Sequence, residues 1–521
     1  MRKITRFTLA IIVALTMTIT TITPVYAERT NTFDYTWGVM GIEHTAAGFQ
    51  IARVIDSSYM PIPMERVDDI AVGGGFVFIA DSAMGRVNVL DAKDYSFVTS
   101  IRLVRDEDNN IVIIEETNEQ LMLDGPEGVF FNTYLNRLYI ADTSAYRIVV
   151  LDGSTFHLIE IITRPDDMTG NTAFRPSQLV VDNTGRIFFM VSGSFEGLVA
   201  LDPDGSFARY FGTTRPHMSP VEYFWRSIAT AEQRMLMPRT FAPAFSGVDI
   251  DQDGFVFAVT ADSASTYKLF RFNARGDNVI RSEGNMGFIE ESSRGFMGGD
   301  MSQFVAVAAT DFGVYAVVDR TFGRVFVYDF DGYLITIFSQ IGDTMGDLND
   351  PSSLAWNGYD ILVGDRTLGV VNVFTPTRFG AAALAANQAY HEGRWEEANY
   401  LFREAVALNA TFYSAYSGIG RNLLMQRRYL EAMYYFDLAF DQEGYSRAWA
   451  GRRGELIEQY FPIIAIVVVS LAALLIITEA RYLRKARYQD GEISDKKPKI
   501  KKASKSVKVK NVISEKVKEG S

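Results

Sequence analysis

An aspartate, an arginine and a second aspartate recur at five-residue intervals three times along this chain, and this repeat constrains the fold more than any other feature. A mostly apolar run between the arginine and the second aspartate is typical of a short β-strand bounded by turns. The close copies are Asp81–Asp91, Asp142–Asp152 and Asp319–Asp329, and the looser ones are Ser192–Asp202, Asp262–Asn273 and Asp365–Thr375. Six copies of one strand-and-turn unit predict a repeat fold.

A second apolar segment lies upstream of each copy and supplies the first strand of each unit. These segments are Asp69–Val72, Pro126–Phe131, Pro176–Val181, Gly247–Ile250, Phe304–Val307 and Pro351–Trp356. Turns such as Asn183–Gly185 and Asp251–Gly254 join the first strand to the second. A single sheet of three or four short strands cannot cover both of its faces, whereas sheets stacked around an axis cover one another. The pattern predicts an all-β six-bladed propeller over residues 28–377.

The last unit ends after three strands, near Thr375. An alternating segment at Phe49–Ile55 is therefore expected to supply the missing outer strand and to close the ring between its two ends.

The blade pattern resembles that of NHL-repeat proteins, over roughly residues 64–377. The resemblance implies six blades and a role as an extracellular sensor or assembly module. The repeated aspartates and arginines are interpreted as turn caps and cross-strand charge pairs rather than as ligand-binding groups.

After Pro376 the composition becomes rich in alanine with helical spacing, and Trp395–Ala405 recurs 34 residues later as Tyr429–Ala439. This spacing resembles the tetratricopeptide repeat (TPR), which implies a small all-α module over residues 378–460. A further helix at about Ser446–Tyr460 is expected to cap the pair. The module could bind a peptide or partner protein, or serve as a stiff spacer.

Residues 1–27 have the three parts of a signal peptide. Arg2, Lys3 and Arg6 precede an apolar core, and small residues at Val25 and Ala27 fit a cleavage site. An uncleaved signal anchor is the alternative. The chain has no cysteine, which for an exported protein suggests a Gram-positive type of bacterial envelope.

A second apolar run, Phe461–Thr478, contains no charged residue. As a helix it would span roughly 27 Å, enough for one transmembrane crossing. Basic residues from Arg481 onward place the C-terminus in the cytoplasm by the positive-inside rule. We therefore expect a single-pass type I protein of the cell membrane, with a basic, disordered cytoplasmic tail at 479–521 whose lysines lie against anionic lipid.

The net charge of −12 is the sum of two basic termini and a still more acidic region between them. Because an acidic body repels phosphate backbones, the propeller and the helices are not expected to bind nucleic acid.

The insertion at about 213–243 is the first candidate binding region, because long propeller loops generally shape one face. Aromatic and arginine side chains are common anchors of interfaces. The candidates there are Tyr223, Phe224, Trp225 and Arg239. A lid packed on the propeller for stability is the alternative.

The mouth of the propeller axis is the second candidate region. Some six-bladed propellers resemble gluconolactonases, in which carboxylates at this mouth hold a divalent metal. Here Glu127 and Gln178 are candidate binding residues, and Asp68, Asp69 and Glu127 are candidate ligands for Ca²⁺ or a similar metal. No further acidic residue is expected at the matching strand starts Gly247, Val305 and Ser353. The four histidines show neither metalloprotease nor triad spacing.

These features lead to one main functional hypothesis and one alternative. The first is a non-catalytic binding or scaffold protein outside the membrane, without a cofactor, whose propeller recognises a ligand and whose helices recruit a membrane protein. A role beside a solute (sugar) transporter is one form of this hypothesis. The alternative is a metal-dependent, gluconolactonase-like hydrolase.

Overall fold

The computed structural model describes residues 35–38, 41–114, 118–168, 174–192, 197–212, 229–230, 244–262, 265, 267–280 and 302–494. The expected signal peptide, nearly all of the 213–243 insertion and the chain after 494 lie outside the described residues. Residues 1–449 and 450–521 form two separate compact units.

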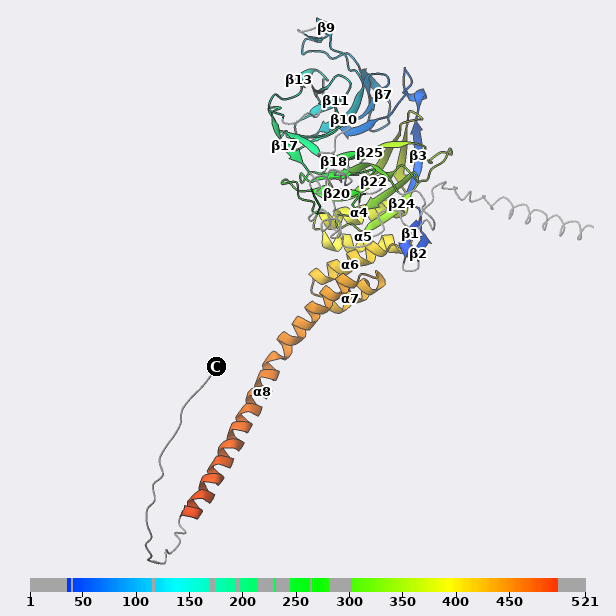
Figure 1. The fold of residues 1–521 in the computed structure, drawn as a ribbon. Coiled ribbons are helices and arrows are strands. Elements are labelled where there is room, and N and C mark those ends of the chain that lie inside the picture. Colours follow the sequence, from blue (N-terminus) through cyan, green and yellow to red (C-terminus); the bar gives the residue numbers. More distant parts are fainter. Residues whose placement is uncertain are drawn as a thin grey trace, which may run out of the picture. The chain divides into compact units, whose positions relative to one another are not determined.

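Six antiparallel sheets make up the propeller (Figure 1). Blade 1 contains β4 (Asp69–Gly73), β5 (Phe76–Asp81), β6 (Arg86–Asp91) and β7 (Phe97–Ile101). Blade 2 contains β10 (Pro126–Asn132), β11 (Arg137–Asp142), β12 (Arg147–Asp152) and β13 (Leu158–Ile162). Blade 3 contains β14 (Pro176–Val181), β15 (Ile187–Val191), β16 (Leu198–Leu201) and β17 (Phe207–Phe211).

The other three blades follow the same order along the chain. Blade 4 contains β18 (Gly247–Ile250), β19 (Val256–Val259) and β20 (Leu269–Phe272). Blade 5 contains β21 (Phe304–Ala309), β22 (Tyr315–Asp319), β23 (Arg324–Tyr328) and β24 (Leu334–Phe338). Blade 6 contains β25 (Pro351–Asn357), β26 (Asp360–Asp365) and β27 (Val370–Pro376). The first strands of neighbouring blades contact one another from β4 around to β25 and back to β4, which confirms the predicted six-bladed propeller.

The ring is closed by β3 (Phe49–Ile55), which pairs antiparallel with β27 as the outer strand of blade 6. The register joins Phe49 to Pro376 and Val54 to Asn372. The predicted closure is thus confirmed. Two further strands, β1 (Tyr35–Gly38) and β2 (Gly41–His44), extend blade 5 beyond β24, which the sequence pattern did not indicate.

Short elements connect or extend the blades at two other places. A single 3₁₀ turn, η1 (Ser57–Tyr59), follows β3, and Asp56 caps it by accepting a hydrogen bond from the Ser58 amide. A hairpin of β8 (Ile113–Ile114) and β9 (Glu119–Gln120) extends from the segment between blades 1 and 2.

The repeated aspartate, with its arginine where one is present, holds the segment before the first strand of its blade. In blade 2, Asp142 accepts a 2.7 Å hydrogen bond from the Asp124 amide, just before β10. Arg147 lies 2.8 Å from the same carboxylate and donates to the Met122 carbonyl. In blade 6 the carboxylate of Asp365 accepts from two amides before β25, those of Asn349 and Asp350. Because these carboxylates are buried and bonded within the blade, their role is structural, as the sequence indicated.

Five helices follow the propeller. They are α4 (Arg378–His391), α5 (Trp395–Leu408), α6 (Tyr413–Met425), α7 (Tyr429–Leu438) and α8 (Gln442–Ser494). Thr377 caps α4, because its hydroxyl accepts from the Gly380 amide and donates to the Ala47 carbonyl beside β3. Helices α4 and α5 pack as one pair and α6 and α7 as a second.

The last helix differs from the expected one. A capping helix ending near Tyr460 was predicted, but α8 continues through the apolar run to Ser494, with Pro462 inside it. The sequence Ser446–Tyr460 contains no proline or turn pair that would end a helix before that run. By length and composition α8 could cross a membrane, and none of its most apolar window is buried.

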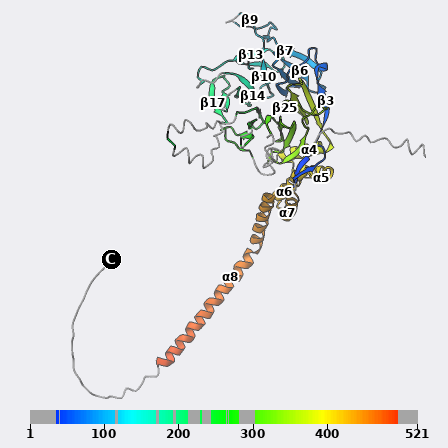
Figure 2. The ribbon, with the colours of Figure 1, turned by 45° about the vertical axis from the view of Figure 1, so that its right-hand side comes forward.

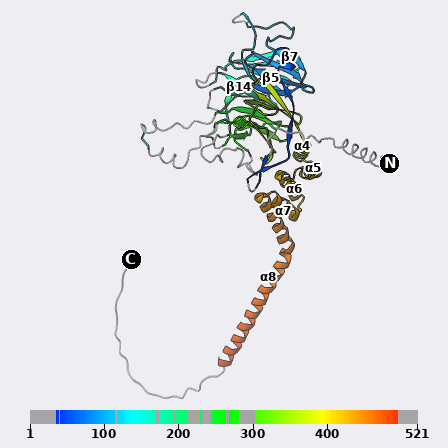
Figure 3. The ribbon, with the colours of Figure 1, turned by 90° about the vertical axis from the view of Figure 1, so that its right-hand side faces the viewer.

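The helical pairs share one hydrophobic core with blades 5 and 6, so they form a single body with the propeller. Phe379 and Leu384 of α4 belong to the same cluster as Phe338 and Phe374 of the blades. In all three views α4 to α7 lie against that side of the propeller (Figure 1, Figure 2 and Figure 3).

One arginine of α6 is inserted between the helices and blade 5. The Arg421 guanidinium lies 3.3 Å from the Asp329 carboxylate and forms a second ion pair with Asp331, both in the turn after β23. The rings of Tyr333 and Tyr390 lie 4.7 and 5.1 Å from the guanidinium carbon. The pairing satisfies charges that burial would otherwise make costly.

Replacing Arg421 with alanine is expected to lower the free energy of unfolding by about 3–5 kcal/mol, because two buried carboxylates would lose their counter-charge. Arg428→Ala is the matched control, since Arg428 pairs with Glu431 on an exposed helix face. Its expected cost is under about 1 kcal/mol. The measurement is denaturant unfolding of the full-length protein in detergent. Equal effects of the two variants would show that the ion pair does not hold the helices to blade 5.

Candidate functional site

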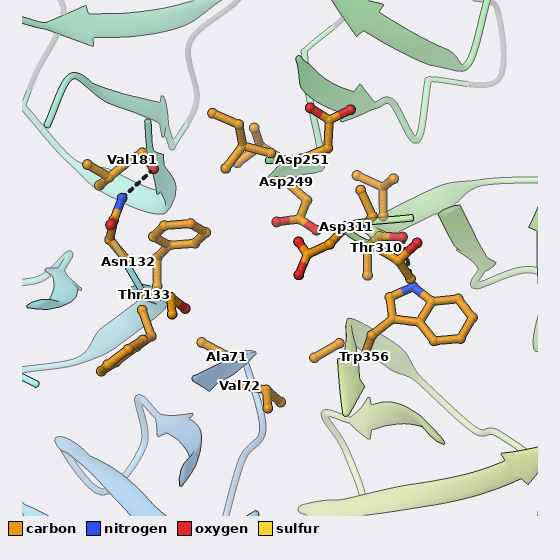
Figure 4. A pocket seen from close by; sticks show the side chains of 18 of the residues that line it. Ala71, Val72, Asn132, Thr133, Val181, Asp249, Asp251, Thr310, Asp311 and Trp356 are labelled. Carbon is orange, nitrogen blue, oxygen red and sulfur yellow. Dashed lines mark hydrogen bonds between the residues drawn. The ribbon is translucent and has the colours of Figure 1, made fainter. Parts of the chain in front are cut away.

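A cavity with a volume of about 770 Å³ lies on the propeller axis (Figure 4). The first strands of all six blades line it. One end opens to solvent, where the Tyr134 side chain on its rim is 77% exposed. The ring of first strands thus encloses a chamber on the propeller axis.

All charged side chains in the described wall of this cavity are acidic. They are Asp69, Asp182, Asp249, Asp251 and Asp311, and the described lining includes no lysine, arginine or histidine. Asp249 lies in β18, whereas Asp251 follows the end of that strand and pairs with Arg271 of the same blade. Asp249 and Asp311 point into the open centre of the pocket (Figure 4).

Asp69 bridges three blades across the axis. One carboxylate oxygen accepts from the Val129 amide of blade 2 at 3.0 Å, and the other accepts from Gln178 Nε2 of blade 3 at 3.2 Å. The pKa of Asp69 is raised to about 8, mainly by burial and to a smaller extent by the charge of Asp249. A group with this pKa changes its charge near neutral pH.

Asp249, on the opposite side of the ring, also links its strand to the next blade through a backbone amide. It accepts from the Ala309 amide of the next blade at 2.7 Å. Burial raises the pKa of Asp249 to about 7, and the nearby charges of Asp251 and Asp311 add to the shift. Burial also raises the pKa of Asp251, whose carboxylate lies 3.1 Å from Arg271.

A second cavity, of about 280 Å³, contains Asp68 and Glu127. Asp68 accepts from Arg66 at 2.8 Å, and Arg366 lies 3.1 Å from the same oxygen. Burial, followed by the charge of Asp68, raises the pKa of Glu127. Arg320 also lines this cavity and pairs with Asp350 at 3.0 Å.

The structure separates the residues that the metal hypothesis grouped together. Asp68 and Glu127 line the smaller cavity, Asp69 lines the larger one, and Gln178 lines both. Nowhere in the described part of the chain do three Asp, Glu, His or Cys side chains gather closely enough to hold a metal ion. Since Asp68 is already held by the guanidinium groups of Arg66 and Arg366, these residues do not fit a divalent metal site.

The candidates in the insertion, Tyr223, Phe224, Trp225 and Arg239, lie outside the described residues. Two serines that line the smaller cavity, Ser246 and Ser352, have structural roles. Their hydroxyls donate to the carbonyls of Phe304 and Val67 in the following blade, each at 2.6 Å.

The acidic group of blades 4 and 5 was not predicted from the sequence. No acidic residue was expected at the start of the blade 4 strand, but Asp249 lies two residues beyond Gly247 and lines the axial cavity. The available signal was a single aspartate in the otherwise uncharged strand segment Gly247–Ile250.

Fold and cavity together define a six-bladed β-propeller with an acidic axial chamber. A scan against protein-family models found no match, and a search of curated proteins also found none. Solved structures similar to it include virginiamycin B lyase from Staphylococcus aureus, at 11% identity and a TM-score of 0.38 over 63% of this chain and 99% of that one. A streptogramin B lyase has 11% identity and a TM-score of 0.36 over 63% and 98%. The Cps50 (Swd1) propeller domain of Myceliophteria thermophila has 9% identity and a TM-score of 0.36, over 63% of this chain and 100% of that one.

The raised pKa of Asp249 predicts a pH-dependent cost to folding. The unfolded aspartate titrates near ~3.9, so between about pH 4 and 7 the folded state binds more protons and stability falls as pH rises. Asp249→Asn keeps an oxygen acceptor for the Ala309 amide but cannot ionise. We expect it to raise the melting temperature at pH 8.5 by roughly 2–5 °C and to change it much less at pH 4.5.

Asp204→Asn is the control for this experiment, because Asp204 lies in an exposed turn outside the cavity. It should shift the melting temperature little at either pH. A stabilisation by Asp249→Asn that is the same at pH 4.5 and 8.5 would contradict the assigned titration.

Proposed function

We propose that this protein is a membrane-anchored binding or scaffold protein whose propeller is displayed outside the cytoplasmic membrane. The carrying observation is the apolar segment of α8, whose side chains have no covering partner among the described residues. Val469, Leu475 and Ile476 are each about two-thirds exposed, at 66%, 68% and 67%. Exposed apolar surface on that scale is stable in lipid and not in water.

The direction of insertion in this proposal follows from the flanking charges. Basic residues follow the apolar segment at once, and a signal-peptide pattern precedes the propeller. The propeller and the helical pairs would then lie outside the cell, with the lysine-rich tail in the cytoplasm. The likenesses to NHL and TPR repeats belong to this proposal and support a binding role rather than a catalytic one.

The helical pairs act in this proposal as a rigid connector. Arg421 and Ser417 of α6 face the propeller, where Arg421 pairs with the turn after β23. Ser417 and Tyr333 of blade 5 both donate to Asp441. Because the propeller itself occupies these positions, they are not free to bind a peptide. A protein partner in the envelope, such as a component of a solute transporter, would contact other surfaces.

No observation favours the hydrolase alternative. The carboxylates expected to hold its metal lie in two different cavities, and one of them, Asp68, is paired with Arg66 and Arg366. The proposed function therefore rests on binding alone.

Introduced cysteines test the topology directly, because the natural chain contains none. Asp204→Cys places a thiol in an exposed turn of blade 3, and Ser504→Cys places one in the basic tail. In intact cells a membrane-impermeant maleimide should label the first variant and not the second. After permeabilisation both should react.

The cysteine-free chain is the background control for labelling. Reaction at position 504 but not at position 204 in intact cells would mean that the orientation is reversed. Equal protection of both positions would mean that the propeller is not displayed outside.

A further inference from the structure

We propose that the large axial cavity binds an organic cation carrying two or more ammonium groups, of the linear polyamine class. This inference deepens the proposed binding role by naming the ligand class of that site. The carrying observation is the placement of aspartates on opposite sides of a solvent-open, ring-shaped chamber whose described wall holds no basic residue.

The positions of the carboxyl groups favour a ligand with more than one positive charge. Asp69 belongs to blade 1 and Asp249 to blade 4, which face each other across a six-membered ring. The two are within electrostatic reach, because the charge of Asp249 contributes to the pKa of Asp69. A cation with charges at two places along a chain can therefore pair with both sides at once.

The remaining wall suits an aliphatic linker between the charged groups. Small and branched apolar side chains, including Ala71, Val72 and Ala308, lie between the acidic positions. Trp356 lines the same side of the chamber, with its indole nitrogen donating to the Ala308 carbonyl at 3.1 Å. Methylene groups placed against such a wall lose water-exposed apolar surface, which favours binding.

A bare metal ion and an anion both fit this chamber less well. A metal ion needs several ligands around one point. Among the described residues, no three Asp, Glu, His or Cys side chains lie close enough together to hold one. An anion would be repelled, because every charged side chain in the described wall is a carboxylate. An extended diamine or triamine reaches carboxylates that a single ion cannot.

The same arrangement makes binding pH-dependent. Asp69 and Asp249 have pKa values of about 8 and about 7, so both are largely protonated in the empty site at pH 6. Aliphatic ammonium groups stay charged up to about pH 10. Binding should therefore tighten from pH 6 to pH 8.5 and release protons, because the cation favours the ionised carboxylates.

The test is isothermal titration calorimetry of the purified full-length protein in detergent, with putrescine and spermidine as ligands. Butane-1,4-diol is the uncharged match for putrescine, and Mg²⁺ tests for an inorganic cation site. We expect the amines to bind, the diol not to bind, and the amine affinity to fall at least tenfold in the double variant Asp249→Asn/Asp311→Asn. The affinity at pH 6 should be several-fold weaker than at pH 8.5.

The double variant Asp94→Asn/Asp204→Asn is the matched control, because it removes the same charge from exposed turns. It should bind amines as the wild type does. Absence of amine binding, equal loss in both double variants, or Mg²⁺ binding that depends on Asp249 and Asp311 would each overturn the proposal. The assay uses purified protein, so its failure would leave the cysteine-labelling result and the topology standing.

Discussion

The pairing of β3 with β27 is the constraint on which the rest of this structure depends. It closes the ring with hydrogen bonds between the two ends of the propeller, so that blade 6 has no missing strand. The residues beside β3 also hold the helices, since the Gly48 carbonyl accepts from the Thr377 amide and a side chain at Gly380 would collide with that carbonyl. Phe49 at the start of β3 stacks on Phe338 of blade 5, with ring centroids 4.8 Å apart. Closure and helix docking are therefore one packing arrangement, and neither can be lost alone.

The sequence predicted the parts of the fold that are encoded locally and repeated. Asp142 and Arg147 lie five residues apart, and the hydrogen bonds that explain them stay within one blade, so the pattern could be read without a structure. Ring closure was also predictable, because a blade lacking one strand needs a strand from elsewhere. The extension of blade 5 by β1 and β2 was not, since two four-residue segments carry little periodicity.

The parts that could not be predicted depend on contacts between distant segments. Arg421 meets Asp329 across 92 residues, and Asp329 by sequence is simply the last residue of a blade repeat. Asp329 also pairs with Arg421 of α6, and this contact depends on where the helices pack. The candidate site shows the same limit. Glu127 and Asp69 appear equivalent at two strand starts, yet their side chains line different cavities, because strand register and not sequence position decides which way each one faces.

The axial carboxylates are difficult to explain by stability alone. Asp69 and Asp249 each tie an inner strand to the next blade, but an asparagine could accept the same amide hydrogen bonds without carrying charge. A buried carboxyl that ionises near neutral pH costs folding free energy whenever it is charged. Two other buried aspartates of the propeller follow a different rule, since Asp81 and Asp142 are each compensated by an arginine in the same blade. In the axial chamber, by contrast, Asp69 and Asp249 have only amide hydrogen-bond donors as partners. The chamber that these two carboxyl groups line is also open to solvent. A cation from solution is the partner that this arrangement leaves room for.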